Sequence, residues 1–84
     1  MPPYRIEWPE EAKTDIRAIP PHIAMNILTA IHRFAESGSG QVKELKGKDG
    51  EKRLRVGDFR VRFTEEHPET LRIHTVKNRK DAYR

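Results

Sequence analysis

The sequence predicts an α+β fold, in which an N-terminal strand and an antiparallel helix hairpin precede a mainly antiparallel sheet of about four strands, β-α-α-β-β-β. Between residues 10 and 37, apolar residues recur every three or four positions, which is the period of an amphipathic helix. Between residues 53 and 74, apolar and charged residues alternate, which is typical of strands with one buried face. The chain has 84 residues, so we expect one domain spanning residues 1–84.

The first strand and the first helix are predicted from a short alternating segment and a proline. Residues 4–8 alternate between apolar and charged side chains, and Pro9 ends this strand. Proline also suits the first turn of a helix. The two glutamates that follow it would lie near the positive end of the helix dipole, which stabilises their negative charge. The helix has one apolar stripe, formed by Ala12, Ile16 and Ile19.

A second helix is predicted over about residues 22–37. Pro20 and Pro21 end the first helix and begin the second, and so short a link makes the pair an antiparallel hairpin. A Ser-Gly-Ser-Gly segment ends the second helix and offers glycine for a left-handed cap. Its apolar stripe, with Met25 beside it, is expected to be core.

The second half of the chain is predicted to be β-structure. Residues 53–56 and 59–63 alternate strictly and are joined by Gly57 and Asp58, a two-residue loop with the glycine that a type II′ turn requires first. Residues 64–70 are expected to form a longer turn before a strand over residues 71–74. Residues 42–46 have a composition that allows a further strand, and residues 77–84 are expected to be a polar tail.

The tight loop fixes the register of this hairpin and so gathers arginines on one face. Arg55 is expected opposite Arg60, and Arg53 opposite Arg62, all pointing away from the helices. Arg72 and His74 are expected to join them from the next strand. Like charges that face each other across a sheet are unfavourable, and a bound anion would turn this repulsion into binding.

A purely structural interpretation of these arginines also exists. Exposed arginines on strands are common and aid solubility, and Glu7, Glu51 and Glu65 are available to neutralise some of them. For a single arginine this interpretation is the better one. For the set as a whole, phosphate binding is favoured, because arginine is well suited to phosphate geometry.

Composition restricts the class of partner and the compartment. Residues 1–41 carry a net charge of −1 and residues 42–84 a net charge of +5, which favours a polyanionic partner. The chain has no cysteine and no long apolar run, so we expect a cytoplasmic protein that does not bind a membrane. The four histidines have no metal-binding spacing, so neither a metal site nor a cofactor is expected.

Two segments resemble toxins of the RelE/ParE family in type II toxin–antitoxin systems. Residues 54–61, Leu-Arg-Val-Gly-Asp-Phe-Arg-Val, are similar to the family's central hairpin, commonly LRVGDYRV. Residues 78–83, Asn-Arg-Lys-Asp-Ala-Tyr, resemble its C-terminal HRxxxY element. The order of the predicted elements fits as well, so the resemblance covers nearly the whole chain and implies a RelE-like fold.

The resemblance implies roles for four residues in a ribonuclease site. Arg60 corresponds to the arginine at the scissile phosphate, while Arg79 and Tyr83 correspond to the second catalytic arginine and the C-terminal tyrosine. Arg53 stands where one of two catalytic lysines is typical. The chain departs from the pattern with Glu51 at the other lysine position and with Asn78 in place of histidine; both put the proton-transfer scheme in doubt.

The leading hypothesis is therefore an endoribonuclease toxin that cleaves mRNA on the ribosome without a metal, through the RNA 2′-OH. The resemblance does not separate this branch from ParE-like inhibitors of DNA gyrase, and an inactive RNA-binding member is a third possibility. The expected partners are a cognate antitoxin protein, the ribosome and mRNA. The remaining candidates for RNA binding are Arg55, Arg62, Lys52, Arg72, His74, Lys77 and Lys80.

Overall fold

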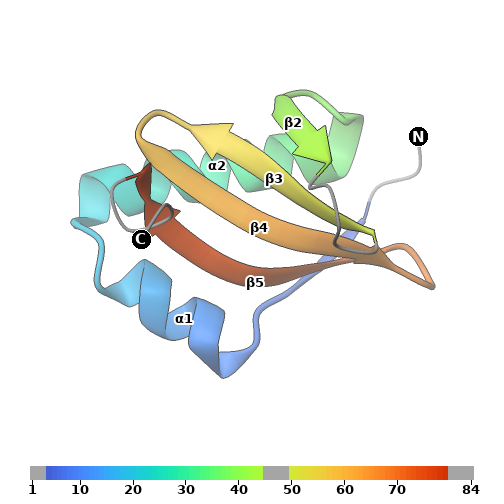
Figure 1. Ribbon diagram of the computed structural model, residues 1–84, viewed down its shortest axis with the longest axis horizontal. Helices are drawn as coiled ribbons and strands as arrows, with labels where there is room; N and C mark the ends of the chain where they lie inside the picture. Colours follow the sequence, from blue (N-terminus) through green and yellow to red (C-terminus); the bar gives the residue numbers. More distant parts are fainter. Residues whose placement is uncertain (1–3, 45–49, 80–84) are drawn as a thin grey trace.

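The computed structural model describes residues 4–44 and 50–79. Within these ranges the chain forms one strand, two helices and four further strands (Figure 1). In chain order they are β1 (Arg5–Glu7), α1 (Glu10–Arg17), α2 (Pro21–Ser37), β2 (Gln41–Glu44), β3 (Glu51–Val56), β4 (Phe59–Glu66) and β5 (Thr70–Asn78).

The five strands form a single mixed sheet in the order β1-β5-β4-β3-β2. β1 is parallel to β5, and the other neighbouring pairs are antiparallel. The predicted α+β class and element order are confirmed. The sheet has five strands where about four were expected, and β2 is the additional one. The later strands are also longer than expected: β4 extends to Glu66, and β5 includes Lys77 and Asn78, which were assigned to the tail.

Both helices begin close to where the sequence predicts and α2 ends there as well, whereas α1 ends at Arg17, before Ile19 of its predicted stripe. Pro9 precedes α1, whose first turn contains Glu10 and Glu11, and Pro21 occupies the first turn of α2. Gly38 caps α2 in the left-handed conformation, with φ of 77° and its N–H donating to the carbonyl of Phe34. Figure 1 shows α2 crossing behind the sheet and α1 lying along the β5 side, so neither helix covers the other face of the sheet, which we call the uncovered sheet face.

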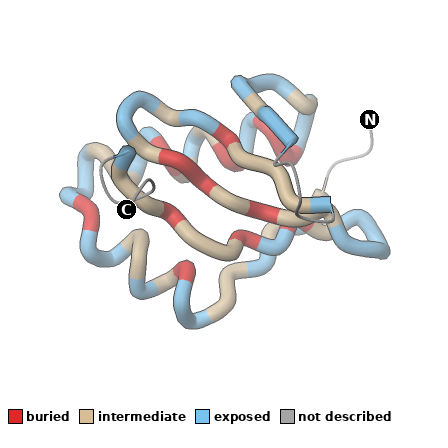
Figure 2. Tube along the Cα trace, viewed as in Figure 1, coloured by how far each residue is buried: buried red, intermediate tan, exposed pale blue. Residues whose placement is uncertain are grey.

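The core lies between the sheet and the helices. Buried side chains come from the inward positions of β3, β4 and β5 and from the sheet-facing sides of both helices (Figure 2). At its centre the rings of Phe34 and Phe63 pack at a tilt, with centroids 5.3 Å apart. The expectation that Met25 belongs to the core is wrong: this residue is 61% exposed, because it points away from the buried stripe of α2 that contains Ile27 and Ile31.

Asp15 of α1 covers a backbone edge that β1 is too short to reach. β1 pairs with β5 only as far as Arg72, which leaves the later part of β5 at the edge of the sheet. The Asp15 carboxylate accepts a hydrogen bond from the N–H of Val76 and another from Nζ of Lys77, both at 2.9 Å. A side chain therefore takes the place of a neighbouring strand, and the edge is protected from pairing with another chain.

A second polar cluster lies on the helix side of the sheet, at its other end. Lys52 Nζ is 2.6 Å from Glu65 Oε2, and the hydroxyl of Tyr4 donates to Glu65 Oε1. The hydrogen bond from Lys52 lowers the pKa of Glu65, and the same bond raises the pKa of Lys52. Partial burial and the hydrogen bond to Glu65 raise the pKa of Tyr4. The cluster ties β1 to β3 and β4.

Replacing Glu65 with Gln is expected to remove a pH-dependent part of the stability. The pKa of Glu65 is lower in the folded protein, so its contribution is present above the ordinary value of 4.5 and is lost as the pH falls through the folded-state pKa. Urea denaturation at a series of pH values should show the advantage of the wild type over Glu65→Gln shrinking in acid. Glu36→Gln, at an exposed position of α2, is the control; parallel curves for wild type and Glu65→Gln would contradict the assignment.

Candidate nucleic-acid interface

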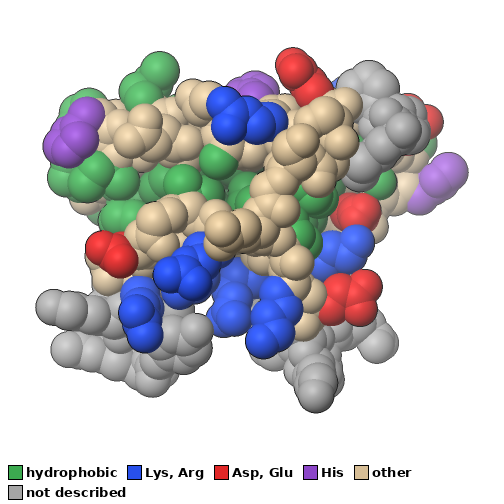
Figure 3. All heavy atoms as spheres, turned by 90° about the horizontal axis from the view of Figure 1, so that it is seen from above, with side chains coloured by type: hydrophobic (Ala, Val, Ile, Leu, Met, Phe, Trp, Pro, Cys, Tyr) green, Lys and Arg blue, Asp and Glu red, His purple; other side chains and the backbone are tan. Residues whose placement is uncertain are grey.

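The turn between β3 and β4 sets the register of the uncovered sheet face. Gly57 has φ of +58°, and of the two loop residues only this glycine has a positive φ, as a type II′ turn requires. The register confirms the predicted pairs, with Arg55 opposite Arg60 and Arg53 opposite Arg62. These side chains lie on the face away from α2, where Figure 3 shows lysines and arginines gathered along one side of the molecule.

The register extends across the sheet and produces two polar rows. One row runs through four strands from Gln41 of β2 to Lys77 of β5, with Arg55 and Arg60 between them. The parallel row runs from Lys43 to Thr75, through Arg53 and Arg62. Side chains that face each other directly lie within about 5.5 Å at their Cβ atoms, so each row concentrates positive charge on neighbouring strands.

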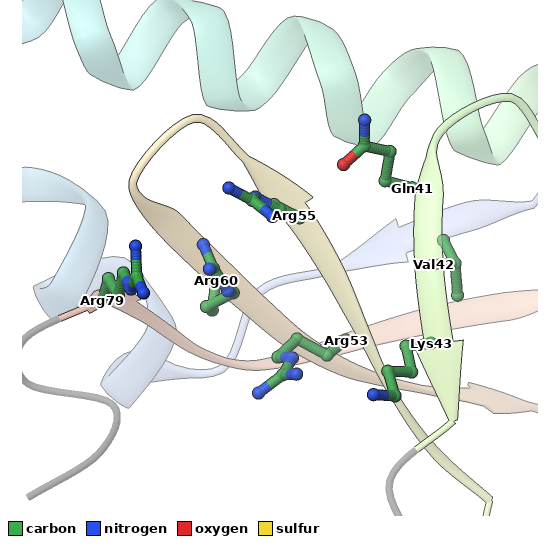
Figure 4. A pocket seen from close by; sticks show the side chains of 7 residues that line it. All are labelled: Gln41, Val42, Lys43, Arg53, Arg55, Arg60 and Arg79. Atoms are coloured by element: carbon green, nitrogen blue, oxygen red, sulfur yellow. The ribbon is translucent and has the colours of Figure 1, made fainter.

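These rows border a hollow of about 480 Å³, which we call the arginine hollow. Its volume is in the range of small-ligand sites, about 300–1,000 Å³. Figure 4 shows arginines of β3 and β4 beneath it, β2 along one side and Arg79 on the opposite side. The described residues that line it include no carboxylate: they are Gln41, Val42, Lys43, Arg53, Arg55, Arg60 and Arg79.

Arg60 is the only charged side chain in the buried part of the described chain, with 6% of its surface exposed. Its Nη1 donates to the carbonyl oxygens of Gly57, at 3.3 Å, and Phe59, at 3.2 Å, so the guanidinium folds back onto its own turn. Within residues 4–44 and 50–79, no carboxylate forms an ion pair with it. A buried charge without a counter-ion is costly, and an anion in the hollow would remove that cost.

Arg79 is brought to the same hollow by a backbone contact with the turn. Its N–H donates to the carbonyl of Asp58 at 2.6 Å, immediately after β5 ends. The turn therefore holds Arg60 from one side and Arg79 from the other. These two arginines, 19 positions apart in the sequence, lie at one site together with Arg53 and Arg55, so four of the predicted residues come together.

The other end of the same sheet face is neutralised by acidic residues. Arg62 Nε donates to Glu51 Oε1 at 2.5 Å, and Glu51 is only 15% exposed. Arg72 bonds Glu7, with Nη2 2.7 Å from Oε1. Both arginines lie outside the hollow, so the predicted basic face is narrower than expected.

His74 and Lys77 are also outside the hollow. β5 has an irregularity opposite Arg62 and Phe63 that leaves His74 without a direct partner on β4; its Nε2 lies 2.9 Å from Oγ1 of Thr64. Lys77 is opposite Arg60 in the register, but its Nζ turns to Asp15 of α1. Neither residue borders the space in which the arginines meet.

Lys52 is on the opposite side of the sheet, paired with Glu65, and does not belong to the arginine hollow. Alternation turns it away from Arg53, so it does not join the arginines, and its predicted role in RNA binding stays a prediction. Tyr83 and Lys80 lie outside the described residues, so their predicted roles stay predictions.

Sequence reasoning missed the contribution of β2, which lines one side of the hollow with Gln41, Val42 and Lys43. The short alternation of residues 41–44, with one apolar residue at position 42, was the available signal. Without the strand pairing, it gave no reason to place Gln41 and Lys43 beside the arginines.

Within residues 4–44 and 50–79, no group of three or more His, Asp or Glu side chains is arranged to hold a metal ion. No helix in these ranges has the length and apolar character needed to cross a membrane.

Comparison with known proteins identifies the family. A family model described as the ParE toxin of the type II toxin–antitoxin system parDE matches residues 6–83, so the chain belongs to this family within the RelE/ParE superfamily and is a type II toxin. A search of curated proteins found no significant match.

Solved structures of RelE toxin complexes share the fold. The RelB–RelE antitoxin–toxin complex from Methanococcus jannaschii matches with a TM-score of 0.75 and 25% identity, over 90% of this chain and 93% of that one. The RelBE2 toxin–antitoxin complex from Mycobacterium tuberculosis matches with a TM-score of 0.76 and 21% identity, over 90% and 98%. The archaeal RelE–RelB complex from Pyrococcus horikoshii OT3 gives 0.75 and 19%, over 90% and 94%.

Small polyphosphates are expected to stabilise the protein through Arg60. Pyrophosphate should raise the Tm more than sodium chloride of equal ionic strength, because it supplies a counter-ion to a buried guanidinium that pairs with no carboxylate among the described residues. At one hundred times Kd the gain is about 2.7 kcal/mol. Arg60→Met should abolish this difference. Arg72→Met is the matched control and should keep it, since Arg72 is already paired with Glu7. An equal response from all three proteins in differential scanning fluorimetry would contradict the anion site.

Proposed function

We propose that the arginine hollow binds the phosphate backbone of RNA and that the protein is a toxin that cleaves mRNA on the ribosome. The observation that carries this proposal is the buried guanidinium of Arg60 in a hollow whose charged described residues are all cations. Arginine presents a planar fork of donors that matches phosphate oxygens, and four arginines border the same space.

The proposed reaction is attack by the RNA 2′-OH on the adjacent phosphorus. The 2′-oxygen forms a bond to phosphorus and loses its proton, the bond from phosphorus to the 5′-oxygen breaks, and that oxygen takes up a proton. Negative charge grows on the non-bridging oxygens between these events, and preorganised cations stabilise it. Arg60 and Arg79 would contact the scissile phosphate, and Arg53 would support them.

The described residues that line the hollow include no proton acceptor suited to this reaction. Arginine stays protonated at neutral pH, and Gln41 does not titrate. We assign proton transfer to Tyr83, the residue that corresponds to the C-terminal tyrosine of the family's site. In this scheme Glu51 is not a catalytic group, because its carboxylate holds Arg62.

The proposed partner in the cell is a cognate antitoxin protein. The three RelE structures that share this fold are each complexes of a toxin with its antitoxin. The arginine hollow is open and cationic, so an antitoxin that places acidic side chains over it would neutralise the toxin by charge and by occlusion.

A second function, inhibition of DNA gyrase, is favoured by the family match. The matching model is that of ParE toxins, and ParE-like toxins inhibit gyrase without cleaving RNA. Glu51 and Asn78, the two departures from the ribonuclease pattern, are compatible with this alternative. In that case the hollow would serve in binding only.

Arg60→Ala is expected to slow single-turnover mRNA cleavage on programmed ribosomes by about 10²–10³-fold, the usual effect of removing a preorganised charge contact. Ribosome binding, assayed separately, should persist, since Arg53, Arg55 and Arg79 remain. Deletion from Arg79 onward should cause a similar loss. Arg72→Ala, at the neutralised end of the sheet, is the control and should cleave like the parent.

Mapping of mRNA 5′ ends and of gyrase-linked DNA breaks after brief induction separates the two functions. New 5′ ends with the wild type, absent with Arg60→Ala, support the ribonuclease. Gyrase-linked breaks without new mRNA 5′ ends would overturn the ribonuclease function and support inhibition of gyrase.

Arg55 and Arg62 are expected to differ in their contribution to RNA binding, although both lie on the same face. Arg55→Ala should reduce the slope of log Kd against log salt by about one, since it removes one phosphate contact. Arg62→Ala should leave the slope nearly unchanged, because Glu51 already neutralises this guanidinium. Fluorescence anisotropy with single-stranded RNA measures both. Equal salt slopes for Arg55→Ala and Arg62→Ala would contradict this difference, because they would show that the ion pair with Glu51 does not keep Arg62 from binding RNA.

A further inference from the structure

The side of the arginine hollow formed by β2 has a chemistry different from the rest. Gln41 lies in the same row as Arg55 and Arg60, directly opposite Arg55, and its side chain projects from β2 beside the hollow (Figure 4). Among the described residues that line the hollow, Gln41 is the only one with an uncharged hydrogen-bonding side chain. Its amide oxygen is therefore an acceptor among described side chains whose other polar groups are all donors.

The backbone fixes where this side chain stands. Gly38 ends α2, and Gly40, at φ of +143°, leads into β2. That φ is one that residues with a side chain rarely adopt, so the position favours glycine, and a Cβ there would also lie 2.9 Å from Cδ1 of Leu54, which would have to shift. From there β2 pairs with β3 through Glu44, which holds Gln41 beside Arg55.

An amide can use both its donor and its acceptor on one base edge, whereas a phosphate engages only its donors. Phosphate oxygens only accept hydrogen bonds, so a phosphate would bind the NH2 group of Gln41 and leave the amide oxygen to other donors. A nucleobase edge presents a donor next to an acceptor, and glutamine can satisfy both together. Adenine presents such a pair on two edges, because its amino group lies beside both N1 and N7, and it is the base with which glutamine forms bidentate pairs in the major groove of DNA.

We propose that Gln41 forms a base-recognition subsite that prefers adenine in the RNA strand whose phosphates lie on the arginines. This proposal rests on the proposed RNA binding of the hollow. The phosphate contacts of Arg60 and Arg79 position the strand, and β2 stands on the side opposite Arg79, where a base attached to that strand comes within reach of the amide. Sequence preference and affinity thus reside in different side chains of one site.

Short RNAs of a single base test this assignment. The wild type should bind an adenosine hexamer about 5- to 100-fold more tightly than cytidine or uridine hexamers, which is the discrimination that one bidentate pair supplies. Gln41→Ala should lose this preference and keep the salt slope. Gln41→Asn, which retains the amide, should keep part of it. Lys43→Ala is the matched control on β2 and should weaken all three RNAs alike, with a smaller salt slope.

A chemically modified RNA removes the effect of base stacking from this comparison. Methylation of both N6 hydrogens of adenine abolishes the donor on either edge of the base, and should cost the wild type its preference without affecting Gln41→Ala. If the adenine preference persists unchanged in Gln41→Ala, or if the wild type binds all hexamers alike with a steep salt slope, the subsite is wrong while RNA binding stands. If no RNA binds at low salt, the proposed function itself fails.

Discussion

The two-residue turn at Gly57 and Asp58 organises most of what the uncovered sheet face can do. Its geometry sets the pairing of β3 with β4, and a slip of one residue would send the arginines to the core and the apolar residues to solvent. Its carbonyl at Gly57 accepts from the Arg60 guanidinium, and its carbonyl at Asp58 accepts from the N–H of Arg79. One short loop thus holds the register and two of the four arginines of the hollow, and the site is as rigid as the hairpin that carries it.

Acidic residues neutralise the arginines at one end of the sheet face, and none lies in the described lining of the hollow at the other end. At the end near β1, Glu7 and Glu51 neutralise Arg72 and Arg62 at short distances. At the turn end, Arg55 and Arg60 face each other without a carboxylate in the described part of the lining. Like charges in opposite positions reduce stability, so a fold selected for stability alone would have spread the acids evenly. The uneven distribution concentrates positive charge at one place, which is where a polyanion gains most from binding.

Local patterns were sufficient to predict much of this arrangement. Strict alternation and a glycine-first loop determine which residues face each other, so the pairing of Arg55 with Arg60 follows from sequence spacing alone. The proline pair and Gly38 likewise locate the ends of α2. The strand register and the helix ends depend on residues that are close together in the sequence, so they can be predicted from local patterns.

Features that depend on distant contacts could not be predicted in the same way. The pairing of β2 with β3, which brings Gln41 and Lys43 to the hollow, depends on a segment, residues 41–44, that is too short to show a strong period. The irregularity at His74 interrupts the alternation that would have continued along β5. The burial of Arg60 depends on how its side chain folds over the turn, and the ion pair between Glu51 and Arg62 depends on a diagonal contact between strands.

The composition of the hollow also suggests a physical reason for dependence on a large partner, if the proposed ribonuclease function holds. A permanent cation cannot take a proton, but it stabilises a deprotonated 2′-OH and the charge on the phosphate that it attacks. Water in an open hollow screens both effects, since the same charges interact about four times more strongly at an effective dielectric of 20 than in bulk water. A surface that docks over the hollow and excludes water would strengthen every guanidinium contact at once. In the ribonuclease function proposed above, the ribosome would present the mRNA, cover the strand and so complete the electrostatics of the site.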